Sequence, residues 1–136
     1  MQPTTPRDFL RVSLQRLAAA EQIMVVLRLT LEAQYIDGYS VECAFKALIL
    51  EKTPEADRPA LLERLTHGAV YHRPEPLLDR LRERGVSLTP DLARRMRRFD
   101  WTTDLRYETG RRDTGETNGL LRTARAIYQW VEGQIS

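Results

Sequence analysis

The side chains best suited to chemistry in this chain lie close together, in residues 34–51. This stretch carries five polar groups among apolar residues: Tyr35, Tyr39, Glu42, Cys43 and Lys46. Carboxylates, amines, thiols and phenols are the groups that proteins use to transfer protons and to form covalent intermediates. Glu42 and Lys46 are four residues apart, which is the favourable order for an ion pair on a helix surface. The spacing therefore predicts a structural surface pair, with a role in a binding groove as the alternative.

The chain offers little for metal or thiol chemistry. Cys43 is the one cysteine, so an internal disulfide is excluded, and one cysteine with two histidines is a poor basis for a zinc site. We expect Cys43 to be a small buried residue. No metal and no cofactor is expected.

The basic residues are unevenly distributed. Residues 58–112 hold 13 Arg against 8 acidic residues, a net charge of +5, although the whole chain carries only +2. Arginine binds phosphates through two parallel hydrogen bonds and stacks on bases. The basic half is therefore consistent with a nucleic-acid surface. A genomic preference for arginine codons is the competing explanation.

Six residues of this basic half are the candidates for binding nucleic acid or phosphate. For Arg106 the alternative is a salt bridge to Asp104, Glu108 or a neighbouring helix, and for Tyr107 it is packing in the core, which we favour over base stacking. Arg111 and Arg112 lie in a predicted loop that could simply be solvated. Arg97 and Arg98 lie near a helix end, where the helix dipole favours cations. The six are Arg97, Arg98, Arg106, Tyr107, Arg111 and Arg112.

Helical periodicity determines which elements must position these groups. A first helix opens near Pro6, and a second is predicted from about Leu31 to Lys52, ending at Thr53-Pro54 because the residue before proline leaves helical geometry. Local propensity alone would stop this second helix at Gly38. Shorter helices are predicted at residues 59–65, 76–84 and 90–99, the last of them capped by Thr89. Residues 106–117 are predicted to be a loop, and residues 118–135 the last helix. No stretch alternates with a period of two.

The sequence therefore predicts one all-α domain over residues 1–136, an up-and-down bundle of four to five principal helices. No apolar run approaches the length of a membrane span, and residues 1–6 lack the layout of a signal peptide. A cytoplasmic location is the expectation.

Three separated pieces resemble HEPN domains, a family of small helical domains. They are residues 38–50, with Glu42 and Lys46 on a face rich in small residues; residues 101–107, which end in Arg106 and Tyr107; and residues 124–131 of the closing helix. The resemblance implies a helical bundle, RNA or a nucleotide as ligand, and a homodimer. It further implies that Gly38 lies inside the second helix and lets a neighbouring element approach closely. It also implies a minimal nucleotidyltransferase as partner, in a prokaryotic toxin–antitoxin or defence pair.

The residues that carry out HEPN ribonuclease chemistry are not found in their usual arrangement. Active members are marked by an arginine, four to six further residues and then a histidine, which stabilise the charged phosphate and transfer the proton without a metal. No arginine stands five to seven positions before His67 or His72, and no histidine follows Arg106 at that distance. Arg106 aligns best with the family's arginine, whereas we expect His72 to lie in an exposed loop.

Three functions stay open on the sequence. The first is an RNA- or nucleotide-binding HEPN-like protein with weak or absent ribonuclease activity. The second is an active metal-independent endoribonuclease with a shifted site around Arg106, which would then be a catalytic residue, with Glu108, Arg111 or His67 as its partner. The third is a non-catalytic dimeric interaction module. For the dimer we expect a close two-fold contact through Tyr35, Tyr39, Gly38 and Cys43.

Overall fold

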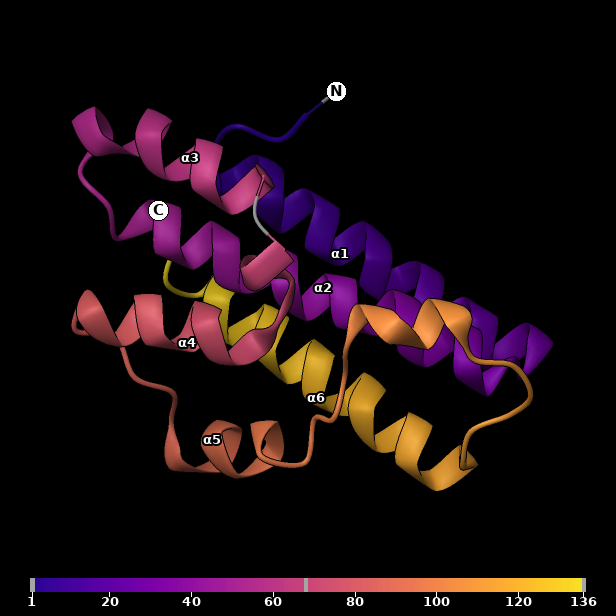
Figure 1. Cartoon of the computed structure of the whole chain (residues 1–136). Coiled ribbons are helices and arrows are strands. Elements are labelled where there is room, and N and C mark those ends of the chain that lie inside the picture. The colour runs from indigo at the N-terminus through magenta and orange to yellow at the C-terminus, as the bar shows by residue number, and fades with distance from the viewer. Residues whose placement is uncertain (1, 68, 136) are drawn as a thin grey trace.

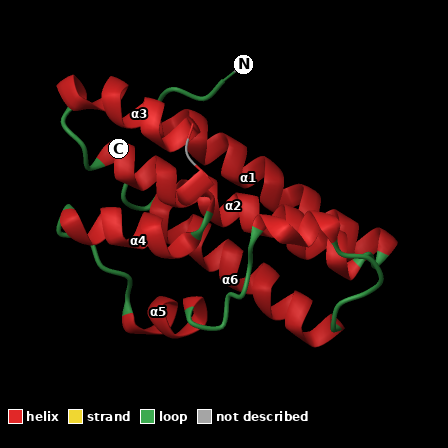
Figure 2. Ribbon diagram, in the orientation of Figure 1, coloured by secondary structure: helices red, strands yellow, loops and turns green. Residues whose placement is uncertain are grey.

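A computed structural model describes residues 2–67 and 69–135, and the side chains of all of these except residues 69 and 70. This part of the chain contains helices and no strand (Figure 2). Six α-helices pack together: α1 (Pro6–Gln22), α2 (Thr30–Glu51), α3 (Arg58–His67), α4 (Pro74–Glu83), α5 (Pro90–Met96) and α6 (Thr114–Glu132). The predicted all-α bundle is thus confirmed, and each α-helix corresponds to one of the six helical segments predicted from the sequence.

Helix α2 runs through the middle of the bundle, between α1 and α6 (Figure 1). The seven residues from Ala44 to Leu50 are all buried. A helix buried on every side must be apolar all round, and this part of α2 is apolar except at Lys46. The α1–α2 contact includes a reciprocal pair: the Ser13 hydroxyl donates to the Ser40 carbonyl oxygen (2.7 Å), and the Ser40 hydroxyl donates to the Ser13 carbonyl oxygen (2.9 Å).

Local capping signals set several helix ends. Thr5 and Asp8 form a capping box at the start of α1, next to Pro6. The Thr89 hydroxyl accepts a hydrogen bond from the Leu92 amide at the start of α5, as the sequence predicted. Helix α2 continues through Gly38 and ends just before Thr53-Pro54, again as predicted.

Two segments differ from the expectation. Helix α1 passes into a turn of π-helix, η1 (Ile23–Leu27), which ends at Arg28 in the left-handed region. The predicted loop 106–117 is only partly a loop, because a 3₁₀ turn, η4 (Thr103–Tyr107), precedes it and α6 begins at Thr114. Asp113 caps α6 by accepting from the Glu116 amide at 2.8 Å, which explains why Gly115 does not delay the helix.

Two short turns complete the described structure. One is the 3₁₀ turn η2 (Glu55–Asp57) before α3, and the other is the 3₁₀ turn η3 (Ala69–His72) before α4. No helix in the described part is long and apolar enough to cross a membrane.

Candidate nucleic-acid interface

One face of α2 carries a row of polar side chains at helical spacing. The Tyr35 and Tyr39 hydroxyls lie 3.1 Å apart, and the Lys46 Nζ donates to Glu42 Oε2 at 2.8 Å. The Glu42 side chain is 8% exposed and the Lys46 side chain 4%. The predicted pairing of Glu42 with Lys46 is present, but the prediction that it lies on the surface is wrong. The ion pair is buried because α2 is the central helix.

A histidine from outside α2 completes this row. In the turn η3, His72 Nδ1 lies 3.2 Å from Glu42 Oε1, and the side chain is 38% exposed. Its Nε2 has no hydrogen-bond partner among the described residues. A buried carboxylate that orients one nitrogen of a part-exposed imidazole is an arrangement found in general acid–base pairs. The expectation of an exposed loop residue missed this contact, since the two residues are thirty positions apart.

Trp101 covers the part of α2 that the sequence assigned to a dimer contact. A Cβ on Gly38 would stand 1.9 Å from Trp101 Cε2, so the indole lies directly on the glycine. Its Nε1 donates to the Tyr35 carbonyl oxygen at 3.2 Å, and its ring meets Tyr39 edge to face, with centroids 5.1 Å apart. The small residue at position 38 therefore serves a contact within the chain. The expected two-fold contact through Gly38 is therefore wrong, because Trp101 of the same chain occupies that face.

Burial explains the electrostatics around this row. It raises the pKa of Tyr39 above its ordinary value, the Tyr35 hydroxyl adds to the rise, and Arg106 opposes it. Burial also raises the pKa of the Cys43 thiol to about 12. Cys43 therefore stays protonated at neutral pH. Its side chain packs against the core but is partly rather than fully buried, so the expectation of a buried residue is met only in part.

Arg106 and Tyr107 form an exposed pair on η4. Tyr107 is 74% exposed, and the Arg106 guanidinium carbon lies 4.8 Å from the centre of its ring. The expected core packing of Tyr107 is wrong, because Leu105 is the residue of this turn that enters the core. The alternative of a salt bridge from Arg106 to Asp104 or Glu108 is not formed, and Glu108 pairs with Arg112 instead, at 3.1 Å.

The two loop arginines have partners within the chain. Arg111 Nη2 donates to the Arg28 carbonyl oxygen at 2.8 Å, which ties the loop to the left-handed residue after η1. Arg112 pairs with Glu108 at 3.1 Å and with Glu116 at 3.8 Å, and its amide donates to the Thr30 hydroxyl at 2.8 Å. These contacts anchor the loop. Phosphate binding by either arginine stays a prediction.

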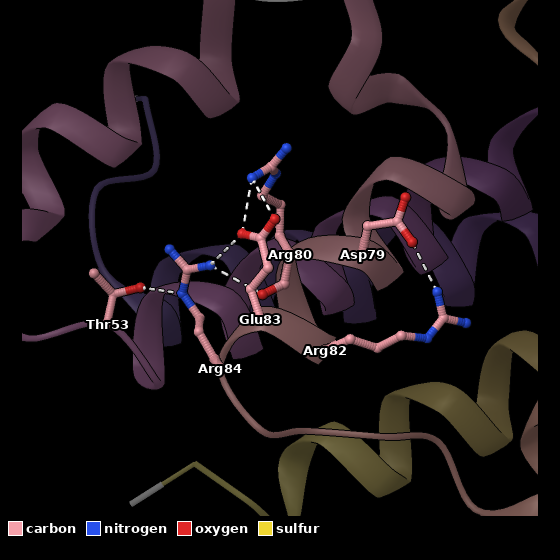
Figure 3. A network of polar contacts seen from close by, with 6 residues as sticks. All are labelled: Thr53, Asp79, Arg80, Arg82, Glu83 and Arg84. Atoms are coloured by element: carbon pink, nitrogen blue, oxygen red, sulfur yellow. Dashed lines mark hydrogen bonds and ion pairs between the residues drawn. The ribbon is translucent and has the colours of Figure 1, made fainter.

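Several other arginines of the basic half are also engaged, as Figure 3 shows for α4. Arg80 pairs with Glu83 and Arg82 with Asp79, each at 2.8 Å. Arg84 Nε donates to the Thr53 hydroxyl at 2.9 Å, which fastens the end of α4 to the end of α2 (Figure 3). On α5, Arg94 and Arg95 both pair with Asp91.

A small set of arginines is left available for a ligand. In the described part of residues 58–112, the side chains of five arginines have neither an ion pair nor a hydrogen bond to protein: Arg64, Arg73, Arg97, Arg98 and Arg106. Three of these are among the sequence candidates. Arg97 and Arg98 are exposed where α5 ends, and Arg106 extends over Tyr107. The site is therefore a strip of surface along residues 97–107, in which Trp101 and Leu105 are buried and hold the strip on α2.

Comparisons of the chain with protein-family models, with curated proteins and with solved structures find no match. The fold and the site together define an all-α bundle that carries a surface strip of unpaired arginines and an exposed tyrosine.

Proposed function

We propose that this protein binds RNA or a nucleotide on a HEPN-like scaffold, with weak or absent ribonuclease activity. The observation that carries the proposal is the exposed Arg106–Tyr107 pair. An exposed tyrosine offers its ring to an unstacked base, and base–aromatic stacking contributes about 1–3 kcal/mol in single-strand binding proteins. Arg106 keeps its donors available for a phosphate while it lies over the ring.

The charge pattern supports single-stranded RNA as the form recognised. Arg97 and Arg98 place two further unpaired cations on the same strip of surface, while Arg94 and Arg95 are neutralised by Asp91. The cations thus follow one short segment rather than a broad face. A flexible single strand can follow such a segment and present its bases to Tyr107.

The direct test is binding of a short fluorescent single-stranded RNA, followed by anisotropy in EDTA over a series of salt concentrations. Tyr107→Ala and Arg106→Ala are expected to weaken binding by about 1–3 kcal/mol. Arg106→Ala should also flatten the salt dependence, because one phosphate contact is lost. Arg7→Ala, at an exposed arginine of α1 without an ion-pair partner in the described structure, is the control. Equal binding by all four proteins would remove the proposal.

An active metal-independent endoribonuclease is the second candidate, and the Glu42–His72 pair is the observation that favours it. Here His72, rather than His67, would transfer the proton of the attacking 2′-hydroxyl, and Arg106 would stabilise charge on the phosphate. Purified protein would then cleave RNA in EDTA, and His72→Ala and Arg106→Ala would each abolish cleavage. Cleavage that persists in both variants would come from a contaminant.

The remaining parts of the proposal concern partners and location. The HEPN resemblance supports a minimal nucleotidyltransferase partner in a toxin–antitoxin or defence pair, in the cytoplasm. A homodimer is also proposed. Because Trp101 occupies the Gly38 face, the exposed apolar side chains of the turn after α1 are the better contact: Val25, Val26, Leu27 and Leu29. Light scattering that gives a monomer at high concentration would exclude the dimer.

A further inference from the structure

A cleft of about 980 Å³ lies between α4 and α5, and Arg97 is the one sequence candidate that lines it. Its apolar wall is lined by the partly buried side chains of Leu78, Val86 and Leu88, behind which the core residues Leu81, Met96, Phe99 and Trp101 also reach the lining. Arg73, Arg82 and Arg97 line it together with Glu75 and Asp100. Figure 1 shows α5 at the edge of the bundle, reached from α4 through a loop that also lines the cleft.

The charged groups of the cleft are mostly unpaired. Arg82 is held by Asp79. Arg73 and Arg97 have no ion pair among the described residues, and neither do Glu75 and Asp100. Arg80 on α4 and Arg94 and Arg95 on α5 are paired along their own helices, whereas Arg73 and Arg97 at this cleft are not. Unpaired cations beside an apolar wall are suited to a ligand that is anionic at one end and apolar at the other.

We infer that this cleft binds a nucleoside 5′-phosphate, with the base on the apolar wall and the phosphate on Arg73 and Arg97. Guanidinium groups bind phosphate oxygens in a fork. A carboxylate such as Glu75 or Asp100 can accept hydrogen bonds from ribose hydroxyls or from a base amino group. A volume near the upper end of the usual ligand-pocket range of about 300–1,000 Å³ holds such a molecule.

The same cleft is poorly suited to an acidic helix from a protein partner. Helix α5 has seven residues, so the wall that it provides is roughly 10 Å long. A helix that docks through side chains at i, i+4 and i+7 spans about 10.5 Å between the first and the last of them, so it would need the full length of this wall. The two unpaired carboxylates in the lining would also repel an acidic peptide.

The site deepens the RNA-binding proposal and rests on it for its biological ligand. Arg97 ends α5, and five residues after Trp101 the chain reaches Arg106 and Tyr107. A strand bound along residues 97–107 would thus pass the mouth of the cleft, which would take one nucleotide turned out of the stack.

The experiment measures binding of adenosine 5′-monophosphate to the full chain by calorimetry, with adenosine and inorganic phosphate as separate probes. Arg97→Glu and Arg73→Glu are each expected to weaken binding of the nucleotide about tenfold or more, since each removes a charge-assisted hydrogen bond. Ala93→Phe, which adds bulk at the cleft without altering charge, should do the same. Arg7→Glu makes the same change of charge on α1 and should leave binding unchanged. Circular dichroism of each variant establishes that it is folded.

The outcomes separate this inference from the RNA proposal. Nucleotide binding that is lost in Arg97→Glu and Ala93→Phe, and kept in Arg7→Glu, supports the cleft. Binding that is equal in all variants, or that inorganic phosphate reproduces with the same affinity, overturns it. If no nucleotide binds while RNA still binds through Tyr107, the cleft inference fails and the proposed function stands. Binding of an acidic amphipathic peptide in place of the nucleotide would assign the cleft to a protein partner and overturn the inference.

Discussion

Gly38→Ala is the change whose effect can be worked out most closely from the structure. The added Cβ would stand 1.9 Å from Trp101 Cε2 and 2.1 Å from Cδ2, whereas carbon atoms pack at about 3.5–4.0 Å. The indole must therefore move by roughly 1.5–2 Å. Trp101 is almost fully buried and bonded to the Tyr35 carbonyl oxygen, so it cannot move without losing contacts.

The magnitude follows from two opposing effects. Replacing a glycine inside a helix by alanine contributes about 1 kcal/mol of stability. Expelling a buried tryptophan costs about 3–5 kcal/mol, judged from truncations of large core side chains. We expect Gly38→Ala to lower the free energy of unfolding by about 2–4 kcal/mol.

Gly119→Ala is the matched control. It also lies inside a helix, α6, but its added Cβ would meet only Arg122 Nη2 at 4.0 Å, so this change should stabilise the protein by up to about 1 kcal/mol. Urea denaturation followed by circular dichroism gives both values. In a Trp130→Phe background, fluorescence reports Trp101 alone, and its emission should shift to the red in Gly38→Ala. A Gly38→Ala protein as stable as Gly119→Ala, with unchanged emission, would refute the packing described here.

Two buried acidic groups give further predictions. Asp37 on α2 is fully buried with both carboxylate oxygens unpaired, and burial, with a smaller effect of Glu21, raises its pKa well above the ordinary 3.8. As the pH rises above 3.8, the Asp37 carboxyl loses its proton in the unfolded chain before it does so in the folded protein. The free energy of unfolding of the wild type therefore falls toward neutral pH, whereas that of Asp37→Asn does not. At pH 7 the variant should be more stable by about 1–3 kcal/mol in urea denaturation; an identical pH dependence of the two proteins would exclude this. Lys46→Met leaves the Glu42 charge buried without its cation and should cost about 3–5 kcal/mol, most of which Glu42→Gln in the same chain should restore. Equal stability of the single and double variants would contradict that buried pair.

Local signals in the sequence were sufficient for the helices whose ends depend on neighbouring residues. Thr89 before Pro90 and the stop at Thr53-Pro54 act through the backbone within one turn. Gly38 inside α2 could not be placed by propensity, which argues for a break. It was placed by the HEPN resemblance, and the reason for the glycine is a side chain sixty-three positions away, Trp101.

The candidate site depended much more on contacts between distant segments. The i, i+4 spacing of Glu42 and Lys46 predicted their pairing but not their burial, because burial follows from the central place of α2. His72 could not be matched to Glu42, since nothing in the chain between them fixes where η3 lies. Which arginines are unpaired also depends on the rotation of each helix: Asp91 faces Arg94 and Arg95 and leaves Arg97 and Arg98 without an acidic partner.

The most direct measurement of the central proposal is the affinity of the protein for single-stranded RNA at low salt, compared with Tyr107→Ala. The account predicts measurable binding by the wild type, a loss of about 1–3 kcal/mol in the variant and a steep fall of both affinities with added salt. Absence of binding by the folded wild type, or the same affinity with and without the Tyr107 ring, would contradict it.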